Sequence, residues 1–257
     1  MNNSALENDH SGVLTFDSSV EVSSRADLLG LMRDTAVVEN QVPANLGLFL
    51  DGKNLSRILL MDHLYKQIVD TQGVVMDFGT RWGHNMTLFQ TLRSIYEPFN
   101  RHRLVLGFDT FEGFPSVAPE DGDSDLMFPG NLGVGVGYTD YLQKLLDTHE
   151  SMNPLAHLQK NQIVKGDAVK TLADYLAKNP QTIVSLAYFD FDIYEPTKKC
   201  LEMIKPRLSK GSIVAFDELN DKDSPGETVA LMEVFGLQNI RLQRYRYASR
   251  VSYFVVE

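Results

Sequence analysis

The chain has 257 residues, of which 43% are apolar and 23% charged, so it is long enough to bury one large core. Its formal net charge is −10 without a cluster of Lys or Arg, which argues against nucleic-acid binding through phosphate neutralisation. Cys200 is the one cysteine and no disulfide can form within the chain. Residues 1–24 lack an apolar signal core, and no run of about 18 apolar residues predicts a membrane span. We therefore expect a cytoplasmic protein that binds neither nucleic acid nor membranes.

Three parts are predicted in chain order. Residues 1–24 are predicted to form a flexible N-terminal arm, residues 25–72 a helical lid and residues 73–257 the main domain. Within the second part, apolar residues such as Leu60 and Leu64 recur at the spacing of a helix.

From Gly73 onward, short apolar strands alternate with helical segments. The predicted strands have the sequences GVVMDFG, RLVLGFD, QIVKGD, IVSLAYFDFD and SIVAFDEL. This alternation requires a mostly parallel sheet covered by helices on both faces, an α/β fold. The last residues, IRLQRYRYASRVSYFVVE, hold two strand-like runs that can pair antiparallel. Residues 115–137 form a long predicted loop rich in Pro, Gly and Asp.

A glycine loop follows the first predicted strand, in the sequence DFGTRWG. An acid, Asp77, precedes a G-x-x-x-G pattern formed by Gly79 and Gly83, which differs from the dinucleotide pattern G-x-G-x-x-G and disfavours an NAD-dependent oxidoreductase. Glycines at such a turn let a ligand approach the backbone closely, although an ordinary strand-to-helix turn has the same pattern. Arg81 could pair with a ligand carboxylate or with Asp77.

Acids also end the second and third predicted strands. Ligands of open parallel sheets bind beyond the carboxyl ends of the strands. Asp109 could accept hydrogen bonds from a ribose diol, and Asp167 from an exocyclic amine such as that of adenine. Phe111 could stack on the base. Each acid taken singly could also be a helix N-cap.

A second acidic group follows the fourth and fifth predicted strands. Asp190 and Asp192 lie two residues apart, and Asp217 and Glu218 are adjacent. Neighbouring strands lie about 4.8 Å apart, so Asp190, Asp217 and Glu218 could converge on one point. Carboxylates that close raise one another's pKa unless a cation is present, and oxygen ligands favour Mg²⁺ or Mn²⁺. Helix caps and solvated loop acids are the alternative interpretation.

Together these segments resemble the macrocin O-methyltransferase-like family of class I methyltransferases. The resemblance spans about residues 70–220 and rests on DFGTRWG at 77–83, GFDTFEGFP at 107–115, KGDA at 165–168, FDFDIYEPT at 189–197 and FDEL at 216–219. It implies a Rossmann-like fold with a mostly parallel seven-stranded sheet, an antiparallel last strand and an N-terminal helical lid.

The resemblance also implies the roles of individual residues. S-adenosyl-L-methionine would be the cofactor, and the residues implied to bind it are Asp77, Gly79, Thr80, Arg81, Gly83, Asp109, Thr110, Phe111, Asp167 and Ala168. Mg²⁺ or Mn²⁺ would be held by Asp190, Asp217 and Glu218, with Asp192 as the catalytic base. The sequence departs from the family where Asp77 replaces the usual Glu and where Asp217–Glu218 replaces the usual pair of aspartates.

The function that follows is the metal-dependent O-methylation of a sugar hydroxyl. The acceptor is expected to be a small molecule, a nucleotide-activated deoxysugar of antibiotic biosynthesis, and the protein is expected to be a homo-oligomer. Two alternatives stay open: a catechol or phenolic O-methyltransferase, and a non-catalytic protein that binds S-adenosylmethionine.

Overall fold

The computed structural model describes residues 17–248 and 250–257. The chain divides into two compact units, and the boundary between them in the sequence lies after Leu59. The first unit contains α1 (Ser19–Arg33), η1 (Glu39–Gln41), η2 (Pro43–Phe49) and the start of α2 (Gly52–Ile68). None of the residues of α1, η1 and η2 is buried. The predicted lid function of this region stays a prediction.

Helix α1 begins inside the segment predicted to be a flexible arm. Ser18 caps its first turn, and the side chain of Glu21 accepts a hydrogen bond from the backbone N–H of Ser18 at 2.8 Å. This reciprocal capping box satisfies backbone donors at the start of the helix and explains why the helix begins at this point. Residues 1–16 of the predicted arm lie outside the described residues.

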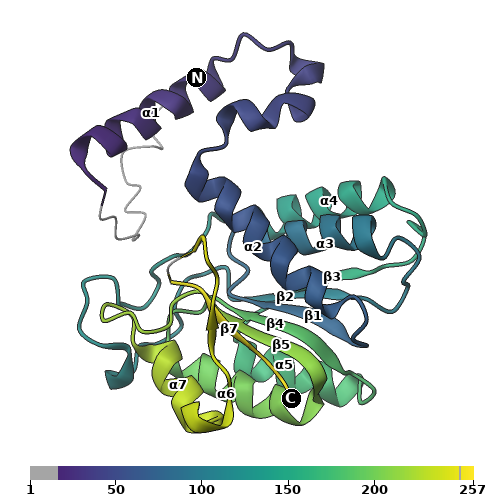
Figure 1. The fold of residues 1–257 in the computed structure, drawn as a ribbon, viewed down its shortest axis with the longest axis vertical. Helices are drawn as coiled ribbons and strands as arrows, with labels where there is room; N and C mark the ends of the chain where they lie inside the picture. The colour runs from purple at the N-terminus through teal and green to yellow at the C-terminus, as the bar shows by residue number, and fades with distance from the viewer. Residues whose placement is uncertain (1–16, 249) are drawn as a thin grey trace. The chain divides into compact units, whose positions relative to one another are not determined.

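The second unit is built on a seven-stranded sheet (Figure 1). In spatial order its strands are β3 (Asn161–Lys165), β2 (Val105–Asp109), β1 (Val74–Phe78), β4 (Val184–Phe189), β5 (Leu208–Phe216), β7 (Ser252–Val255) and β6 (Gln243–Arg244). The pairs from β3 to β5 are parallel, and β7 is antiparallel to both β5 and β6. The predicted α/β fold with an antiparallel end is confirmed.

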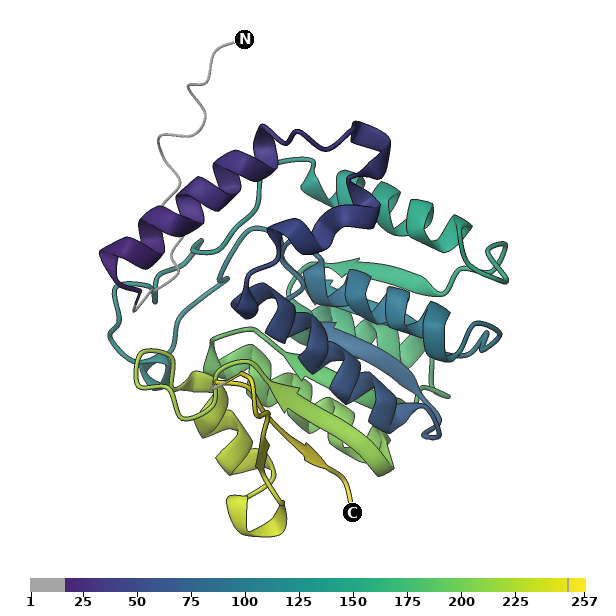
Figure 2. The ribbon, with the colours of Figure 1, turned by 45° about the horizontal axis from the view of Figure 1, so that its top comes forward.

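Helices cover both faces of this sheet (Figures 1 and 2). The part of α2 after Leu59 packs on one face with α3 (His84–Tyr96) and α4 (Tyr138–Ser151). The other face carries α5 (Ala168–Lys178), α6 (Tyr194–Ile204) and α7 (Gly226–Val234). Short 3₁₀ turns complete the unit: η3 (Pro119–Asp121), η4 (Lys205–Arg207) and η5 (Leu237–Asn239). No helix in the described part of the chain has the length and apolarity needed to span a bilayer.

Four phenylalanines form a row across the carboxyl ends of the central strands. Their order is Phe108 on β2, Phe78 on β1, Phe189 on β4 and Phe216 on β5, each in register with the next. Successive ring centroids lie 5.1, 4.6 and 5.3 Å apart, and the rings are fully buried on the face covered by α5, α6 and α7. The register of this Phe row aligns the carboxyl ends of the four strands, and therefore the starts of the loops that follow them.

Candidate active site

The residues that come directly after the Phe row form a second row at the carboxyl edge of the sheet. Backbone hydrogen bonds continue the pairing: Gly79 N donates to Phe108 O at 3.0 Å, and Asp190 N donates to Phe78 O at 2.8 Å. Asp217 N donates to Phe189 O at 2.9 Å. Because side chains alternate along strands, this row faces away from the Phe row, toward the side covered by α2, α3 and α4.

In spatial order the edge row is Asp109, Gly79, Asp190 and Asp217. Asp109, predicted to bind the ribose, and Asp190 and Asp217, predicted to bind the metal, therefore lie on one edge and one face of the sheet. An arrangement on opposite faces, which would exclude a shared site, is not found.

Asp109 holds two loops together through its carboxylate. One oxygen accepts the backbone N–H of Arg81 at 2.7 Å and the other accepts the N–H of Phe111 at 2.5 Å. Both donors belong to residues with positive φ, +43° at Arg81 and +60° at Phe111, a conformation that side chains disfavour. Burial raises the pKa of Asp109, and these two backbone donors oppose the rise. Each carboxylate oxygen keeps further lone pairs for a hydroxyl donor.

The glycines of the first loop are required by the packing of the chain itself. Gly79 has φ +87°, and a Cβ at this position would overlap the carbonyl oxygen of Asp190. Gly83 has φ +76°, and a Cβ there would overlap the side chain of Leu142 on α4. The G-x-x-x-G pattern thus lets the loop lie directly against β4 and α4, whatever ligand it binds.

Between these glycines, Thr80 and Arg81 differ in what they offer a ligand. The hydroxyl of Thr80 is buried and donates to the carbonyl of Asp77 at 3.1 Å, so only the backbone of Thr80 is available to a cofactor. The Nε–H of Arg81 is buried and has no hydrogen-bond partner among the described residues. Trp82 is half exposed and packs edge-on against Tyr138, with ring centroids 4.9 Å apart.

Asp77 lies two residues before Gly79 of the edge row and is fully buried. Its carboxylate accepts a hydrogen bond from the side-chain amide of Asn85 on α3 at 3.3 Å. The register places Asp77 between Gly107 of β2 and Tyr188 of β4. Asp77 is therefore a buried residue beneath the first loop, and its predicted contact with the cofactor stays a prediction.

The third strand ends at a helix cap. Asp167 accepts the backbone N–H of Val169 at 3.0 Å and pairs with Lys170 at 3.0 Å, so it is the N-cap of α5. Ala168 is the buried first residue of this helix. Gly166 N donates to Asp109 O at 2.8 Å, which brings the cap residue Asp167 next to Asp109, the predicted ribose-binding residue. Capping and adenine binding are compatible, because a carboxylate has several lone pairs.

The remaining predicted cofactor residues lie on the loop after β2. Thr110 donates its hydroxyl to the carbonyl of Gly113 at 2.7 Å, which closes a tight turn. Phe111 is 4% exposed and belongs to the core on the face covered by α2, α3 and α4. Its predicted stacking on a base stays a prediction.

The acidic half of the edge row is crowded with negative charge. Asp192 has φ +63°, and burial raises its pKa well above the ordinary value for a carboxyl group. Three neighbouring carboxylates raise it further, in the order Asp190, Glu227 and Asp217, while Arg250 lowers it. Asp217 accepts a hydrogen bond from the hydroxyl of Tyr188 at 2.7 Å. A carboxyl group with such neighbours binds a proton more readily than an exposed one.

Glu218, the third predicted metal ligand, has other partners in this structure. Its carboxylate forms an ion pair with Arg250 and accepts a hydrogen bond from the hydroxyl of Ser224. Across residues 17–248 and 250–257, no three His, Cys, Asp or Glu side chains are grouped closely enough to hold a metal ion. For Glu218 to bind a metal, its pairing with Arg250 would have to open.

Two buried acids near Asp192 were not predicted from the sequence. Glu227, at the start of α7, is fully buried, and Asp121, in the long loop, is 1% exposed. Glu227 lies in the first turn of a helix, where acids are common, so its position in the sequence does not indicate burial. Asp121 lies in the polar run EDGDSD, where nothing distinguishes a buried acid from a solvated one.

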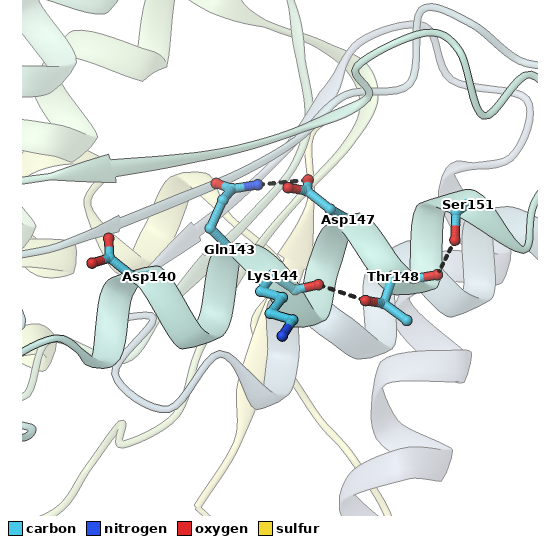
Figure 3. Close-up of a pocket in the computed structure, with 6 residues that line it drawn as sticks. All are labelled: Asp140, Gln143, Lys144, Asp147, Thr148 and Ser151. Atoms are coloured by element: carbon cyan, nitrogen blue, oxygen red, sulfur yellow. Dashed lines mark hydrogen bonds between the residues drawn. The ribbon is translucent and has the colours of Figure 1, made fainter.

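A shallow pocket on α4 has no connection to the edge row through its lining residues. Figure 3 shows the side chains that line it: Asp140, Gln143, Lys144, Asp147, Thr148 and Ser151. All lie on one helix, and Gln143 donates to Asp147 at 2.8 Å within it. Their spacing of three to four residues is that of a single exposed helix face.

A sheet of this strand order, with a carboxylate at the end of β2 and loops gathered at one edge, defines the class I methyltransferase fold. Comparison with solved structures agrees. The chain is similar to CalS11, a calicheamicin methyltransferase, with 41% identity and a TM-score of 0.92, over 95% of this chain and 96% of that one.

A second structure, of the apo form of CalS11, is described as a TDP-rhamnose 3′-O-methyltransferase of calicheamicin biosynthesis. It shares 39% identity with a TM-score of 0.84, over 94% of this chain and 96% of that one. The O-methyltransferase NovP shares the fold at 18% identity, with a TM-score of 0.58 over 78% of this chain and 79% of that one. No protein-family model and no curated protein sequence matches the chain significantly.

This chain belongs to the O-methyltransferase family of CalS11, and it is an S-adenosylmethionine-dependent O-methyltransferase. The family predicted from the sequence motifs is confirmed.

Proposed function

We propose that this chain transfers a methyl group from S-adenosylmethionine to a hydroxyl of a nucleotide-activated deoxysugar in an antibiotic pathway. The observation that carries the proposal is the edge row, in which Asp109 on one side and Asp190 and Asp217 on the other share one face of the sheet. Likeness to a TDP-rhamnose 3′-O-methyltransferase supports the sugar acceptor.

The cofactor would lie over the loops that follow β1, β2 and β3. Asp109 would accept the ribose hydroxyls, and the loop after β3, with Asp167 and Ala168, would border the adenine. The buried Nε–H of Arg81, which has no partner among the described residues, fits a carboxylate such as that of the methionine moiety. An arginine placed on a loop fixed by Asp109 would bind that carboxylate without further rearrangement.

Asp192 would take the proton of the attacking sugar hydroxyl. Its raised pKa follows from burial and from the surrounding carboxylates, and it suits a base that must hold a proton after the transfer. Holding the oxygen, the methyl group and the sulfur in line would supply much of the rate, in favourable cases about 7–11 kcal/mol of the barrier.

A divalent cation, Mg²⁺ or Mn²⁺, fits part of the predicted site. Asp190 and Asp217 follow adjacent strands of the edge row, and their charges act on the same neighbours, Asp192 and Glu227, so these two carboxylates would hold it. When bound, such an ion would lower the pKa of a coordinated hydroxyl. The role of Glu218 as a third ligand stays a prediction, because here it is paired with Arg250.

The test is a screen of methyl transfer to TDP-deoxysugars and to catechols, with and without EDTA. We expect turnover with a nucleotide sugar, loss of turnover in EDTA, recovery with added Mg²⁺ or Mn²⁺, and little effect of the metal in the variant Asp217→Ala. Turnover with catechols alone would contradict the sugar acceptor. Full activity in EDTA would contradict the role of the metal and leave the acceptor assignment in place.

A further inference from the structure

Glu227 is a fully buried acid that contacts the turn carrying Asp192. Its Oε1 atom accepts the backbone N–H of Phe191 at 3.0 Å, and the N–H of Asp192 also faces this carboxylate. Its Oε2 atom is buried and has no hydrogen-bond partner among the described residues. A buried carboxylate retained in this condition requires a reason, because burying an acid with an unsatisfied oxygen is unfavourable.

The turn that Glu227 contacts has an unfavourable backbone conformation. Asp192 adopts φ +63°, in the left-handed region that residues other than glycine, Asn and Asp rarely occupy. Such a conformation persists only where the surrounding structure holds it in place. The two consecutive N–H groups at Phe191 and Asp192 both face one carboxylate, which is an arrangement that an extended backbone would not give.

Helix α7 reaches this turn because its first residue is a glycine. A Cβ at Gly226 would stand 2.6 Å from the backbone nitrogen of Tyr194 and 3.0 Å from the carbonyl carbon of Ile193. Any larger residue would push the start of the helix away from the turn. The pair Gly226–Glu227 therefore acts together: the glycine allows the approach and the acid binds the backbone.

A second buried acid holds the far end of the same turn. The Oδ1 atom of Asp121 accepts the N–H of Tyr194 at 2.5 Å, and its Oδ2 atom accepts the N–H of Ala118 at 2.7 Å. Both oxygens of Asp121 are thus satisfied, and the N–H that it binds lies two residues from Asp192. Asp121 provides a comparison: it stabilises the start of α6 without contacting the backbone at Phe191 or Asp192.

Other charges surround Glu227 unfavourably. Burial and the charges of Asp190 and Asp217 raise its pKa to about 8, and only the backbone donors of the turn lower it. An apolar residue would avoid this repulsion, but it would leave the N–H groups of Phe191 and Asp192 without this acceptor. A carboxylate here is therefore explained better by what it does to the turn than by its contribution to the core.

We propose that Glu227 is a positioning residue for methyl transfer, which fixes the backbone at Phe191 and Asp192 so that the Asp192 carboxylate is held in place for the acceptor hydroxyl. The proposal rests on the proposed function for the role of Asp192. The acceptor oxygen of Glu227, rather than its charge, is the feature that holds the turn.

The experiment compares Glu227→Ala and Glu227→Gln with the unaltered chain, using Met232→Ala, an exposed residue of the same helix, as the control. A displacement of about 1 Å at the base lowers the rate by about 10²-fold, so we expect this loss of kcat in the alanine variant, with the KM for S-adenosylmethionine unchanged. Glutamine keeps an acceptor oxygen and should retain kcat within about threefold. Hydrogen exchange of the amides of Phe191 and Asp192 should be faster in the alanine variant alone.

Two results would overturn the proposal: unchanged kcat in a folded alanine variant, or equal losses in the glutamine and alanine variants, which would assign the effect to charge. The proposed function is judged separately, by whether the unaltered chain methylates any nucleotide sugar. If it does not, the exchange comparison still decides whether Glu227 holds the turn, because it requires neither acceptor nor metal. Equal hydrogen exchange of the Phe191 and Asp192 amides in all variants would show that Glu227 does not hold the turn.

Discussion

The carboxylates at the two sides of the proposed site have opposite surroundings. The cofactor half is the side with Asp109 and Asp167, where we propose that the cofactor lies, and the acceptor half is the side with Asp190, Asp192 and Asp217. In the cofactor half, backbone N–H groups satisfy the acids: Asp109 accepts from the loops after β1 and β2, and Asp167 accepts from the first turn of α5. In the acceptor half, burial raises the pKa of Asp192, and the charges of Asp190, Glu227 and Asp217 raise it further. The acids of the cofactor half are thus held by backbone donors of the chain, whereas the acceptor half carries negative charge that a proton, a cation or a substrate would balance.

Under the proposed function, this difference lets one sheet edge serve two ligands. Carboxylates fixed by backbone donors keep their geometry whether or not a ligand is bound, which suits a cofactor that is common to many methyltransferases. Crowded carboxylates respond to what binds, which suits proton transfer. Four substitutions test this contrast.

The largest effect is expected in the acceptor half, from Asp192→Asn. Removal of a general base lowers kcat by about 10²–10⁴-fold, and calorimetry should show unchanged affinity for S-adenosylhomocysteine. The exposed residue Asp174 on α5 gives the control, Asp174→Asn, which should leave both quantities unchanged. A loss of cofactor affinity in Asp192→Asn would break the division into two halves.

The next effect is expected where the halves meet, from Gly79→Ala. Its Cβ would overlap Asp190 O at φ +87°, so we expect the free energy of unfolding in urea to fall by about 3 kcal/mol or more. Gly130→Ala is the matched control, since Gly130 has φ +86° with open space around it and should lose only about 1–2 kcal/mol. Equal losses of stability in the two variants would mean that the overlap with Asp190 O adds nothing to the cost of Gly79→Ala.

A smaller effect is expected in the cofactor half, from Asp109→Asn. Hydrogen bonds to a charged group are worth about 1.5–3 kcal/mol, so the Kd for S-adenosylhomocysteine should rise by at least about tenfold. At saturating cofactor, kcat should stay within a few-fold of its original value, as calorimetry and initial rates together would show. A large fall in kcat with unchanged Kd would place Asp109 in the acceptor half instead.

The smallest effect is expected from Thr80→Val, which removes a buried hydroxyl of the same loop. The hydroxyl donates to Asp77 O, so its loss should lower the free energy of unfolding by about 1 kcal/mol. The affinity for S-adenosylhomocysteine should stay the same, because the side chain faces the interior. Weaker cofactor binding without loss of stability would show that the hydroxyl binds the cofactor after all.

The sequence predicted the sheet and its edge well, because both depend on local patterns. Each central strand is an apolar run that ends in Phe followed by Asp or Gly, so the same letters determine the Phe row and the edge row. The motifs FDTFEGFP and DFDIYEPT carried the family assignment, which the comparisons confirm.

What the sequence could not supply depends on contacts between distant segments. Glu227 is buried because Gly226 packs on the turn before α6, and Glu218 pairs with Arg250 from the C-terminal hairpin. Neither contact has a local pattern. The start of α1 was missed for a different reason, since the capping box of Ser18 and Glu21 lies in a segment whose composition is otherwise that of a tail.

The Phe row has a consequence for how this enzyme can diversify. Because the rings stack from β2 to β5 in strict register, the separation between the residues at positions 109 and 217 is set by three strand-to-strand steps, about 14 Å in all. The loops above can change in length and sequence while this interval stays constant. Loops after β5 can therefore be replaced while Asp109, the proposed ribose-binding residue, and Asp217, the proposed metal ligand, keep their spacing.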